Sequence, residues 1–390
     1  MTERFQLLCI CFAISIANLF VAPVAAQENE VPVQKVSAQN TFVDVLTTSE
    51  EIVEPKVVES WPNEIVVEAA EVVVGEQTPI EPGEAQCVRV KKSILGCMEG
   101  IMILPQDEVW LINARACVCG ETDPSLFVVS KLEGSDLVPA DLSDLTAAHA
   151  SGDGLATILY VHGNQTNEEF AIARGLQVYR NAVAKKAHCR QGVRYVIWAW
   201  KSEQEKPRFY PDYLVKSQRS VLLGESFAWT LNQFNDRNVV VFGYSLGVQV
   251  ILSAFDSPSL LHREHDPTRY QVAFAAPAIN ADYVATHGLT MGGHTPVAQT
   301  IVFTNRKDRA IRAAQAIVRR RSPATNPTIA GLSDAGKLDL GAVTSIDVFE
   351  EAGRFHSIER YTRSETLQLE MVNLINAVSS NRADSQIIVE

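Results

Sequence analysis

The sequence predicts an α/β fold in which a mostly parallel, doubly wound sheet carries helices on both faces. Strand-like and helix-like segments alternate from about residue 107 onward, which is typical of this architecture. The clearest strand-like segment, at residues 156–161, is continuous and β-branched, as expected for a buried parallel strand. With 46% hydrophobic and 21% charged residues, the 390-residue chain can bury a sizeable core. In such a fold we expect ligands at the carboxyl ends of the strands.

The N-terminal segment has the features of a signal peptide covering residues 1–26. Arg4 precedes a mostly apolar run over residues 5–24, and small residues lead up to Ala26. A transmembrane anchor is the competing interpretation, because the run is nearly long enough to span a bilayer. Pro23 and the cleavage-like Ala26 favour removal, so we expect an exported mature chain.

Residues 27–86 form an acidic segment that we interpret as a disordered linker. They contain 13 acids against Lys35 and Lys56, a net charge of -11. The remaining mature chain has 32 acids and 31 bases, so the overall charge of -12 belongs to this segment and does not indicate what the folded part binds. Scattered prolines and few aromatic residues fit a solvated chain, with a specific acidic binding role as the alternative. We expect no nucleic-acid partner.

Four cysteines cluster in an N-terminal extension over residues 87–125, and a fifth lies further along. These residues are Cys87, Cys97, Cys117, Cys119 and Cys189. Export favours two disulfides among the first four, with three connectivities open, although a bridge between Cys117 and Cys119 would be strained. A zinc site is the alternative, but the C-x9-C and C-x-C spacing lacks paired C-x2-C knuckles. Cys189 is left over, and we expect it to be a buried thiol.

The main domain is expected over residues 107–380, followed by a C-terminal tail at 381–390. Strands are predicted at residues 109–113, 156–161, 194–200, 238–242, 271–275, 299–304 and 345–349. Helices are predicted at residues 167–184, 213–234, 248–255, 309–319 and 364–377.

The segment Gly243-Tyr-Ser245-Leu-Gly247 lies between the apolar strand at 238–242 and the helix at 248–255. A strand that turns sharply into a helix lifts the middle residue above the sheet edge, and the two glycines let the strand and helix backbones approach. The helix N-terminus then offers free N–H groups beside the serine. The pattern predicts a nucleophile at Ser245, with an ordinary tight turn as the competing interpretation.

A serine hydroxyl needs a base to take its proton, and His356 is the best candidate. It lies in a loop between the predicted strand at 345–349 and the last helix, which suits the chain order of nucleophile, acid and histidine. A plain surface histidine is the competing interpretation.

Asp308 is the best candidate for the acid that orients this base. It follows the predicted strand at 299–304, where a carboxylate could reach His356. An N-cap for the helix that begins at Arg309 is the competing role. Asp347 is the alternative acid, but it lies within a predicted strand and its side chain is expected to point into a face of the sheet.

His162-Gly163-Asn164 ends the predicted strand at 156–161, where a fold of this kind supplies one donor of an oxyanion hole. Gly163 permits the backbone to turn an N–H inward. We expect the donors to be the amides of Asn164 and Leu246, with Gln165 as the alternative to Asn164.

Together these residues resemble the α/β-hydrolase superfamily, over about residues 107–377, and most closely a bacterial branch of uncharacterised hydrolase-like proteins. The matching segments are Leu159-Tyr-Val-His162-Gly163-Asn164, Ile197-Trp-Ala-Trp200, Gly243-Tyr-Ser245-Leu-Gly247, Ala275-Ala-Pro277-Ala278, Lys307-Asp308-Arg-Ala310 and Gly353-Arg-Phe-His356. Two positions depart from the family pattern. Ala278 replaces an acidic residue, which puts in doubt any substrate group that residue would bind, and Lys201 replaces a proline. The resemblance implies a Ser-His-Asp triad of Ser245, His356 and Asp308.

We therefore expect an exported serine hydrolase that acts by acyl transfer on a small-molecule acyl substrate. Esters or thioesters of modest size are favoured, because the loops at 256–269 and 283–298 contain no long amphipathic lid. No metal or organic cofactor is required, and no stable membrane insertion is expected after the leader is removed. The oligomeric state stays open.

A second hypothesis is a catalytically silent interaction module of the cell envelope, tethered by its acidic segment. A third is a hydrolase-like fold that binds a cell-wall polymer. The long segment and the cysteine-containing extension are unusual additions to a simple esterase, and they motivate both alternatives.

Overall fold

The computed structural model describes residues 103–117, 123–151, 153–234, 239–261, 270–281, 284, 297–321, 329–332 and 343–386. The expected signal peptide at 1–26, the acidic segment at 27–86 and the cysteines Cys87, Cys97 and Cys119 lie outside the described residues. So do most of the two loops, at 256–269 and 283–298, on which the expected substrate size rests.

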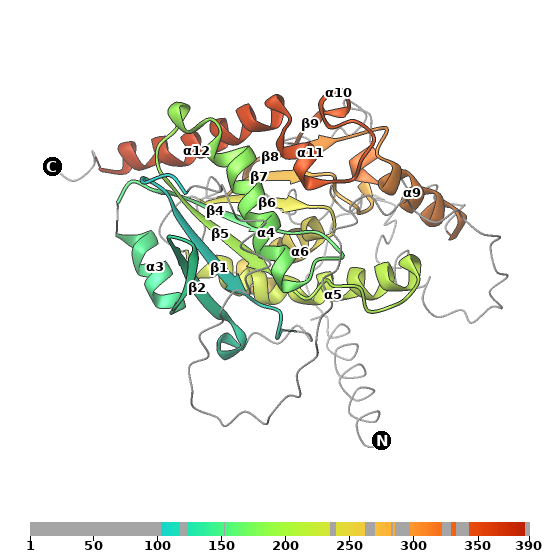
Figure 1. The fold of residues 1–390 in the computed structure, drawn as a ribbon, viewed down its shortest axis with the longest axis horizontal. Coiled ribbons are helices and arrows are strands. Elements are labelled where there is room, and N and C mark those ends of the chain that lie inside the picture. The colour runs from blue at the N-terminus through green and yellow to red at the C-terminus, as the bar shows by residue number, and fades with distance from the viewer. Residues whose placement is uncertain are drawn as a thin grey trace, which may run out of the picture. The chain divides into compact units, whose positions relative to one another are not determined.

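A nine-stranded sheet runs through the described domain (Figure 1). Its order is β3-β2-β1-β5-β4-β6-β7-β8-β9. The strands are β1 (Glu108–Asn113), β2 (Val128–Glu133), β3 (Asp136–Ala140), β4 (Ala156–Val161), β5 (Val193–Ala199), β6 (Val239–Tyr244), β7 (Tyr270–Ala275), β8 (Val297–Thr304) and β9 (Val343–Asp347). From β1 to β9 every neighbouring pair is parallel, and only the β1–β2 and β2–β3 pairs are antiparallel. The predicted mostly parallel sheet is confirmed.

The central strands are mostly apolar because both of their faces are covered. Every residue of β4, β5, β6 and β7 is buried. Val161 at the end of β4 pairs with Trp198 of β5 and with Gly243 of β6. The segments that follow these three strands therefore emerge side by side at one edge of the sheet.

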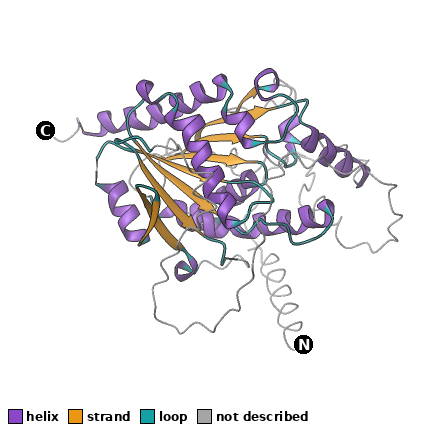
Figure 2. Ribbon diagram, in the orientation of Figure 1, coloured by secondary structure: helices purple, strands orange, loops and turns teal. Residues whose placement is uncertain are grey.

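Helices cover both faces of the sheet (Figure 2), which confirms the doubly wound arrangement. One apolar core contains residues of α5 and α6, and the other contains residues of α4, α11 and α12. The helices are α3 (Leu142–Ala150), α4 (Glu168–Val178), α5 (Phe209–Asn232), α6 (Gly247–Phe255), α7 (Pro258–Leu261), α9 (Arg309–Arg321), α10 (Phe349–Ala352), α11 (Ile358–Thr362) and α12 (Glu365–Gln386). A π-helical turn, Tyr179–Ala184, extends α4, and short 3₁₀ turns lie at Pro124–Leu126, Ala187–Cys189 and Ala330–Leu332.

The hairpin of β2 and β3 and the helix α3 were not predicted. Strand β3 is half-buried or exposed along its length and contains Pro139, which lacks an N–H donor and is tolerated because β3 is an edge strand. Its mixed polar pattern resembles a loop more than a buried strand.

Several predicted boundaries also differ from the structure. The strand expected at 345–349 ends at Asp347, because the Asp347 carboxylate accepts a hydrogen bond from the Phe349 amide, where α10 begins. Helix α12 continues to Gln386, past the expected start of the tail at residue 381.

The described cysteines correct two expectations. Cys117 is a buried free thiol, so two bridges that use all four clustered cysteines are not formed. Its thiol is hydrogen-bonded to Ser226 of α5, and burial raises its pKa. Cys189, expected to be buried, is free and exposed because it closes the surface turn Ala187–Cys189.

None of the helices in the described ranges combines the length and apolar character that a bilayer crossing requires.

Candidate active site

Ser245 occupies the turn between β6, which ends at Tyr244, and α6, which begins at Gly247. Its φ of 52° lies in the left-handed region, which is costly for a residue with a side chain. The surrounding structure holds this conformation: the Ser245 amide donates to the Ala275 carbonyl at 3.0 Å, and the Ser245 carbonyl accepts from the Val248 amide at 3.2 Å. The segment therefore has the geometry of the predicted elbow.

Close contacts surround both glycines of the elbow, with backbone atoms at Gly247 and with the end of a side chain at Gly243. A Cβ atom on Gly247 would lie 2.4 Å from the Val161 carbonyl oxygen and 2.5 Å from that of His162. One on Gly243 would lie 2.6 Å from Ile251 Cδ1. A larger residue at Gly247 would push α6 away from the sheet, whereas one at Gly243 would first displace the end of the Ile251 side chain.

The structure brings Ser245, His356 and Asp308 together in one hydrogen-bonded row. His356 Nε2 lies 3.0 Å from Ser245 Oγ, and His356 Nδ1 lies 2.8 Å from Asp308 Oδ2. Asp308 is fully buried, whereas the His356 side chain is 20% exposed. The row thus runs from a buried carboxylate to the half-buried imidazole, with Ser245 at its end.

Asp308 makes the hydrogen bonds that both of its suggested roles would require. Its Oδ1 accepts hydrogen bonds from the amides of Ala310 and Ile311 at 3.0 and 3.1 Å, which caps the start of α9. Its Oδ2 accepts from His356 and from Tyr361 Oη, the latter at 2.9 Å. Burial would raise the pKa of Asp308, but its attraction to His356 and these hydrogen bonds outweigh burial and lower the pKa.

The alternative acid, Asp347, is turned toward other partners. Its Oδ1 accepts from the Phe349 amide, and its Oδ2 lies 3.4 Å from Arg306 Nε. The structure therefore pairs His356 with Asp308.

Two tyrosines that sequence reasoning missed surround this row. The Tyr244 ring stacks on the His356 ring, with centroids 5.2 Å apart and planes 27° apart. Tyr361 of α11 is fully buried, and burial raises its pKa well above its usual value, so its phenol keeps the hydrogen that it donates to Asp308. Nothing in the local pattern around Tyr361 signals this contact, because it joins segments 53 residues apart.

The loop after β4 adjoins the serine. A Cβ atom on Gly163 would lie 2.9 Å from Ser245 Cβ and 2.9 Å from Tyr244 Cδ1, so only a glycine fits here without displacement. Gln165, two residues on, has a φ of 54° and makes the loop turn sharply. Within the described part of the chain, the amides of Asn164, Gln165 and Leu246 donate to no protein acceptor.

His162 is buried beside this loop and is part of its framework. Its Nδ1 lies 2.9 Å from the Gly163 carbonyl oxygen, and its Nε2 lies 3.1 Å from the Trp200 amide nitrogen. The carbonyl can only accept and the amide can only donate, so the hydrogen is on Nδ1. Burial lowers the pKa of His162 to about 3, so the ring is neutral at neutral pH.

This shift has a measurable effect on stability. In the unfolded chain His162 becomes protonated as the pH falls below its ordinary pKa of 6.5, whereas in the folded protein it stays neutral down to about pH 3. The free energy of unfolding therefore decreases as the pH falls through this window. Between pH 7 and 5 we expect the free energy of unfolding of the wild type to drop by about 2 kcal/mol more than that of His162→Gln, measured by urea denaturation. His188→Gln, which changes an exposed histidine, should keep the wild-type slope. Equal slopes for wild type and His162→Gln would contradict this account.

The two positions that depart from the family pattern take structural roles. The Ala278 carbonyl accepts a hydrogen bond from Tyr213 Oη at 2.7 Å, and Ala278 itself is buried. The Lys201 carbonyl accepts from Arg219 of α5 at 2.9 Å.

A parallel sheet with helices on both faces and a serine on a left-handed turn after a central strand defines an α/β hydrolase. The family model described as "Alpha/beta hydrolase of unknown function (DUF900)" matches residues 143–350, more than half of the chain, and the protein belongs to this family. The resemblance noted in the sequence is thereby confirmed.

Two solved structures are similar to the chain. Bacillus licheniformis lipase BlEst2 in its mature form is 11% identical with a TM-score of 0.31, and the match covers 57% of this chain and 93% of the lipase. Trichoderma reesei cutinase in complex with a C11Y4 phosphonate inhibitor is 12% identical with a TM-score of 0.26, over 61% of this chain and 87% of the cutinase. A search of curated proteins gave no match.

Proposed function

We propose that this α/β hydrolase is a serine hydrolase that cleaves carboxylic esters or thioesters by acyl transfer. The observation that carries the proposal is the row of hydrogen bonds from Ser245 Oγ to His356 Nε2 and from His356 Nδ1 to Asp308 Oδ2. A histidine held this way can accept a proton from the serine hydroxyl on one nitrogen while the carboxylate fixes the other.

In the proposed reaction, Ser245 Oγ attacks the substrate carbonyl carbon as its proton passes to His356 Nε2. The amides of Asn164 and Leu246 stabilise the negative oxygen of the tetrahedral intermediate. His356 then returns the proton to the departing alcohol or thiol, which leaves an acyl group on Ser245. A water molecule, deprotonated by His356, attacks this acyl group, and His356 passes that proton to Ser245 Oγ as the acid is released.

Asp308 stays ionised through this cycle. Its pKa lies below the usual value, and it stabilises the imidazolium that forms at His356. Tyr244 stacks on the same imidazole, which restricts the ring to the orientation that reaches both Ser245 and Asp308.

A fluorophosphonate probe tests the proposal directly, because it reacts covalently with an activated serine. We expect stoichiometric labelling of the wild type and none of Ser245→Ala. Ser253→Ala, which removes another serine hydroxyl in α6, should label like the wild type. Well-folded wild type that takes up no label would contradict the proposal and favour the silent interaction module. Retention on cell-wall polymer by such unlabelled protein would favour the polymer-binding alternative.

We also propose that the protein is exported, which rests on the leader-like sequence at 1–26 alone. The same labelling carried out on fractions of the producing cells tests this location. The labelled chain should appear outside the cytosol and begin at Gln27, whereas a labelled cytosolic chain that begins at Met1 would contradict export.

A further inference from the structure

The Gly163 carbonyl oxygen is held by two buried donors. His162 Nδ1 lies 2.9 Å from it, and Ser202 Oγ lies 3.0 Å from it. Ser202 belongs to the loop after β5, and it is fully buried. It stands in none of the matching family segments, and sequence reasoning did not select it.

This carbonyl shares a rigid unit with the proposed oxyanion donor. The Gly163 C=O and the Asn164 N–H belong to the same planar peptide bond, and no cis peptide occurs in the described ranges. In a trans peptide the C=O and the N–H point in opposite directions, so fixing one fixes the other. Two donors on the carbonyl therefore set the direction of the Asn164 N–H.

The Ser202 hydroxyl is free to serve this acceptor. Its oxygen accepts from the Thr166 amide at 3.2 Å, which leaves its single hydrogen for donation. Thr166 O is a second acceptor at 3.2 Å, but Arg115 Nη1 already donates to it at 3.3 Å. The nearer Gly163 oxygen is thus the better target for the Ser202 hydrogen.

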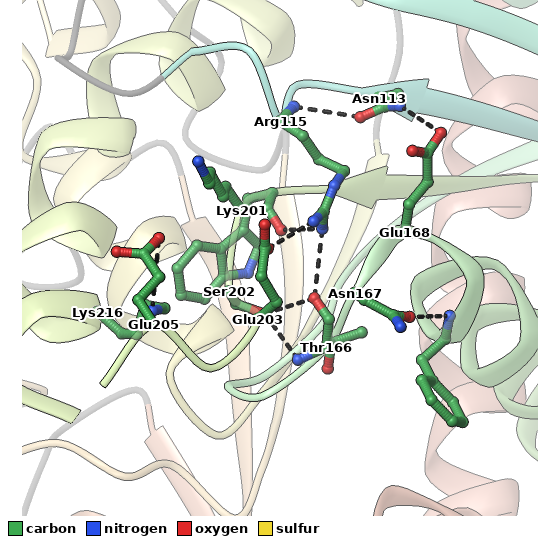
Figure 3. Close-up of polar contacts among 12 residues, drawn as sticks. Asn113, Arg115, Thr166, Asn167, Glu168, Lys201, Ser202, Glu203, Glu205 and Lys216 are labelled. Atoms are coloured by element: carbon green, nitrogen blue, oxygen red, sulfur yellow. Dashed lines mark hydrogen bonds and ion pairs between the residues drawn. The ribbon is translucent and has the colours of Figure 1, made fainter. Parts of the chain in front are cut away.

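Hydrogen bonds hold the loop that carries Ser202 on both sides, so they fix the position of the Ser202 hydroxyl. Figure 3 shows Arg115, which follows β1, reaching Thr166, and Nη1 of Arg115 also donates to the Trp200 carbonyl at 3.0 Å. On the other side, Asp212 Oδ1 accepts from the amides of Glu205 and Lys206 at 2.6 and 2.9 Å.

A buried ion pair secures the second anchor. Lys216 Nζ lies 3.2 Å from Asp212 Oδ1, and both side chains are fully buried in α5. Figure 3 shows Lys216 beside Glu205 of the loop. These contacts hold the loop in a fixed position between α5 and the segment that follows β4.

We propose that Ser202 is a positioning residue that aims the Asn164 amide at the developing oxyanion. The inference rests on the proposed function. It holds that a side chain in the loop after β5 fixes the orientation of an oxyanion-hole donor. Donors that are already oriented before the reaction stabilise the transition state at no cost of reorganisation. Removal of the Ser202 hydroxyl should therefore weaken transition-state binding more than ground-state binding.

The test compares Ser202→Ala, Ser202→Cys and Ser379→Ala in hydrolysis of p-nitrophenyl butyrate. We expect Ser202→Ala to lower kcat about tenfold with KM changed by less than about twofold, and to weaken inhibition by a trifluoromethyl ketone by a similar factor. Ser202→Cys keeps the shape of the side chain and a weak donor, so its kcat should lie between those of Ser202→Ala and the wild type. Ser379→Ala removes a buried hydroxyl that donates to the Ile375 carbonyl in α12, and it should leave kcat unchanged.

The pH profile separates positioning from damage to the triad. The Ser202 variants should keep the wild-type pH dependence of kcat, because the hydrogen bonds of His356 are not touched. A Ser202→Ala enzyme with wild-type kcat and inhibitor affinity would overturn the inference, as would a loss of kcat that Ser202→Cys does not relieve at all. If the wild type itself shows neither turnover nor labelling, the proposed function fails and the inference fails with it. If the wild type is active and Ser202→Ala is indistinguishable from it, only the inference fails.

Discussion

Replacing Asp308 with asparagine is expected to lower kcat by on the order of 10⁴-fold while the protein remains folded. The carboxylate accepts on both oxygens, from the α9 amides on Oδ1 and from His356 and Tyr361 on Oδ2. An amide group can accept on one side only. If its oxygen caps α9, its NH₂ faces His356 and Tyr361, and His356 can meet it only with an unprotonated Nδ1. The hydrogen then moves to Nε2, which can no longer accept a proton from Ser245.

Steady-state hydrolysis of a p-nitrophenyl ester measures this loss, and urea denaturation shows whether the variant is folded. Asp347→Asn is the matched control, because Asp347 is the last residue of the neighbouring strand β9 and contacts Phe349 and Arg306 instead. We expect its kcat to stay within about twofold of the wild type. A severe loss in Asp347→Asn together with near-normal activity in Asp308→Asn would reverse the assignment of the acid.

Replacing Gly163 with alanine is expected to lower kcat by about 10²- to 10³-fold, comparable to the loss of one oxyanion donor. The new methyl group would lie 2.9 Å from Ser245 Cβ, which cannot move because it is fixed to the backbone of the elbow. The loop that carries Asn164 must therefore shift away from the serine. The triad hydrogen bonds would survive, so we expect kcat to fall while KM changes little.

Gly175→Ala provides the matched control for this variant. A Cβ atom on Gly175 would also be too close to a neighbour, at 2.5 Å from Ile197 Cδ1. This contact joins α4 to β5 and does not involve Ser245 or the loop that carries Asn164. It should lower the free energy of unfolding by about 1–3 kcal/mol without a selective loss of kcat. If both variants lose the same fraction of kcat and of stability, the effect of Gly163→Ala is overpacking rather than displacement of the donor.

Most of the fold and the central row of the site could be predicted because their signals are local. An apolar strand, a Gly-x-Ser-x-Gly turn and a helix follow one another within 18 residues, and each element restricts the next. The same holds for the buried strand β4 and the His162-Gly163 segment that follows it. The order of the remaining residues along the chain then selected Asp308 and His356.

The parts that were missed depend on contacts between distant segments. Tyr361 reaches Asp308 from helix α11, and Ser202 reaches Gly163 from the loop after β5, so neither contact leaves a pattern in the surrounding residues. The exposure of Cys189 could not be predicted either, because residue type alone favours burial and the surface turn at Ala187–Cys189 decides otherwise. The edge hairpin of β2 and β3 escaped detection because its strands are partly polar and β3 contains a proline.

One oxygen of Asp308 caps α9 and the other binds His356, so a substitution made to improve the helix cap also changes the contact with His356. Helix starts are common targets when a protein is stabilised, and serine, threonine and asparagine are the usual replacements at an N-cap. At the start of α9 each of them would preserve the helix and disable the proposed acid. A stabilised variant selected by its melting temperature alone could carry such a change unnoticed. Screens of this protein should therefore measure turnover at every round.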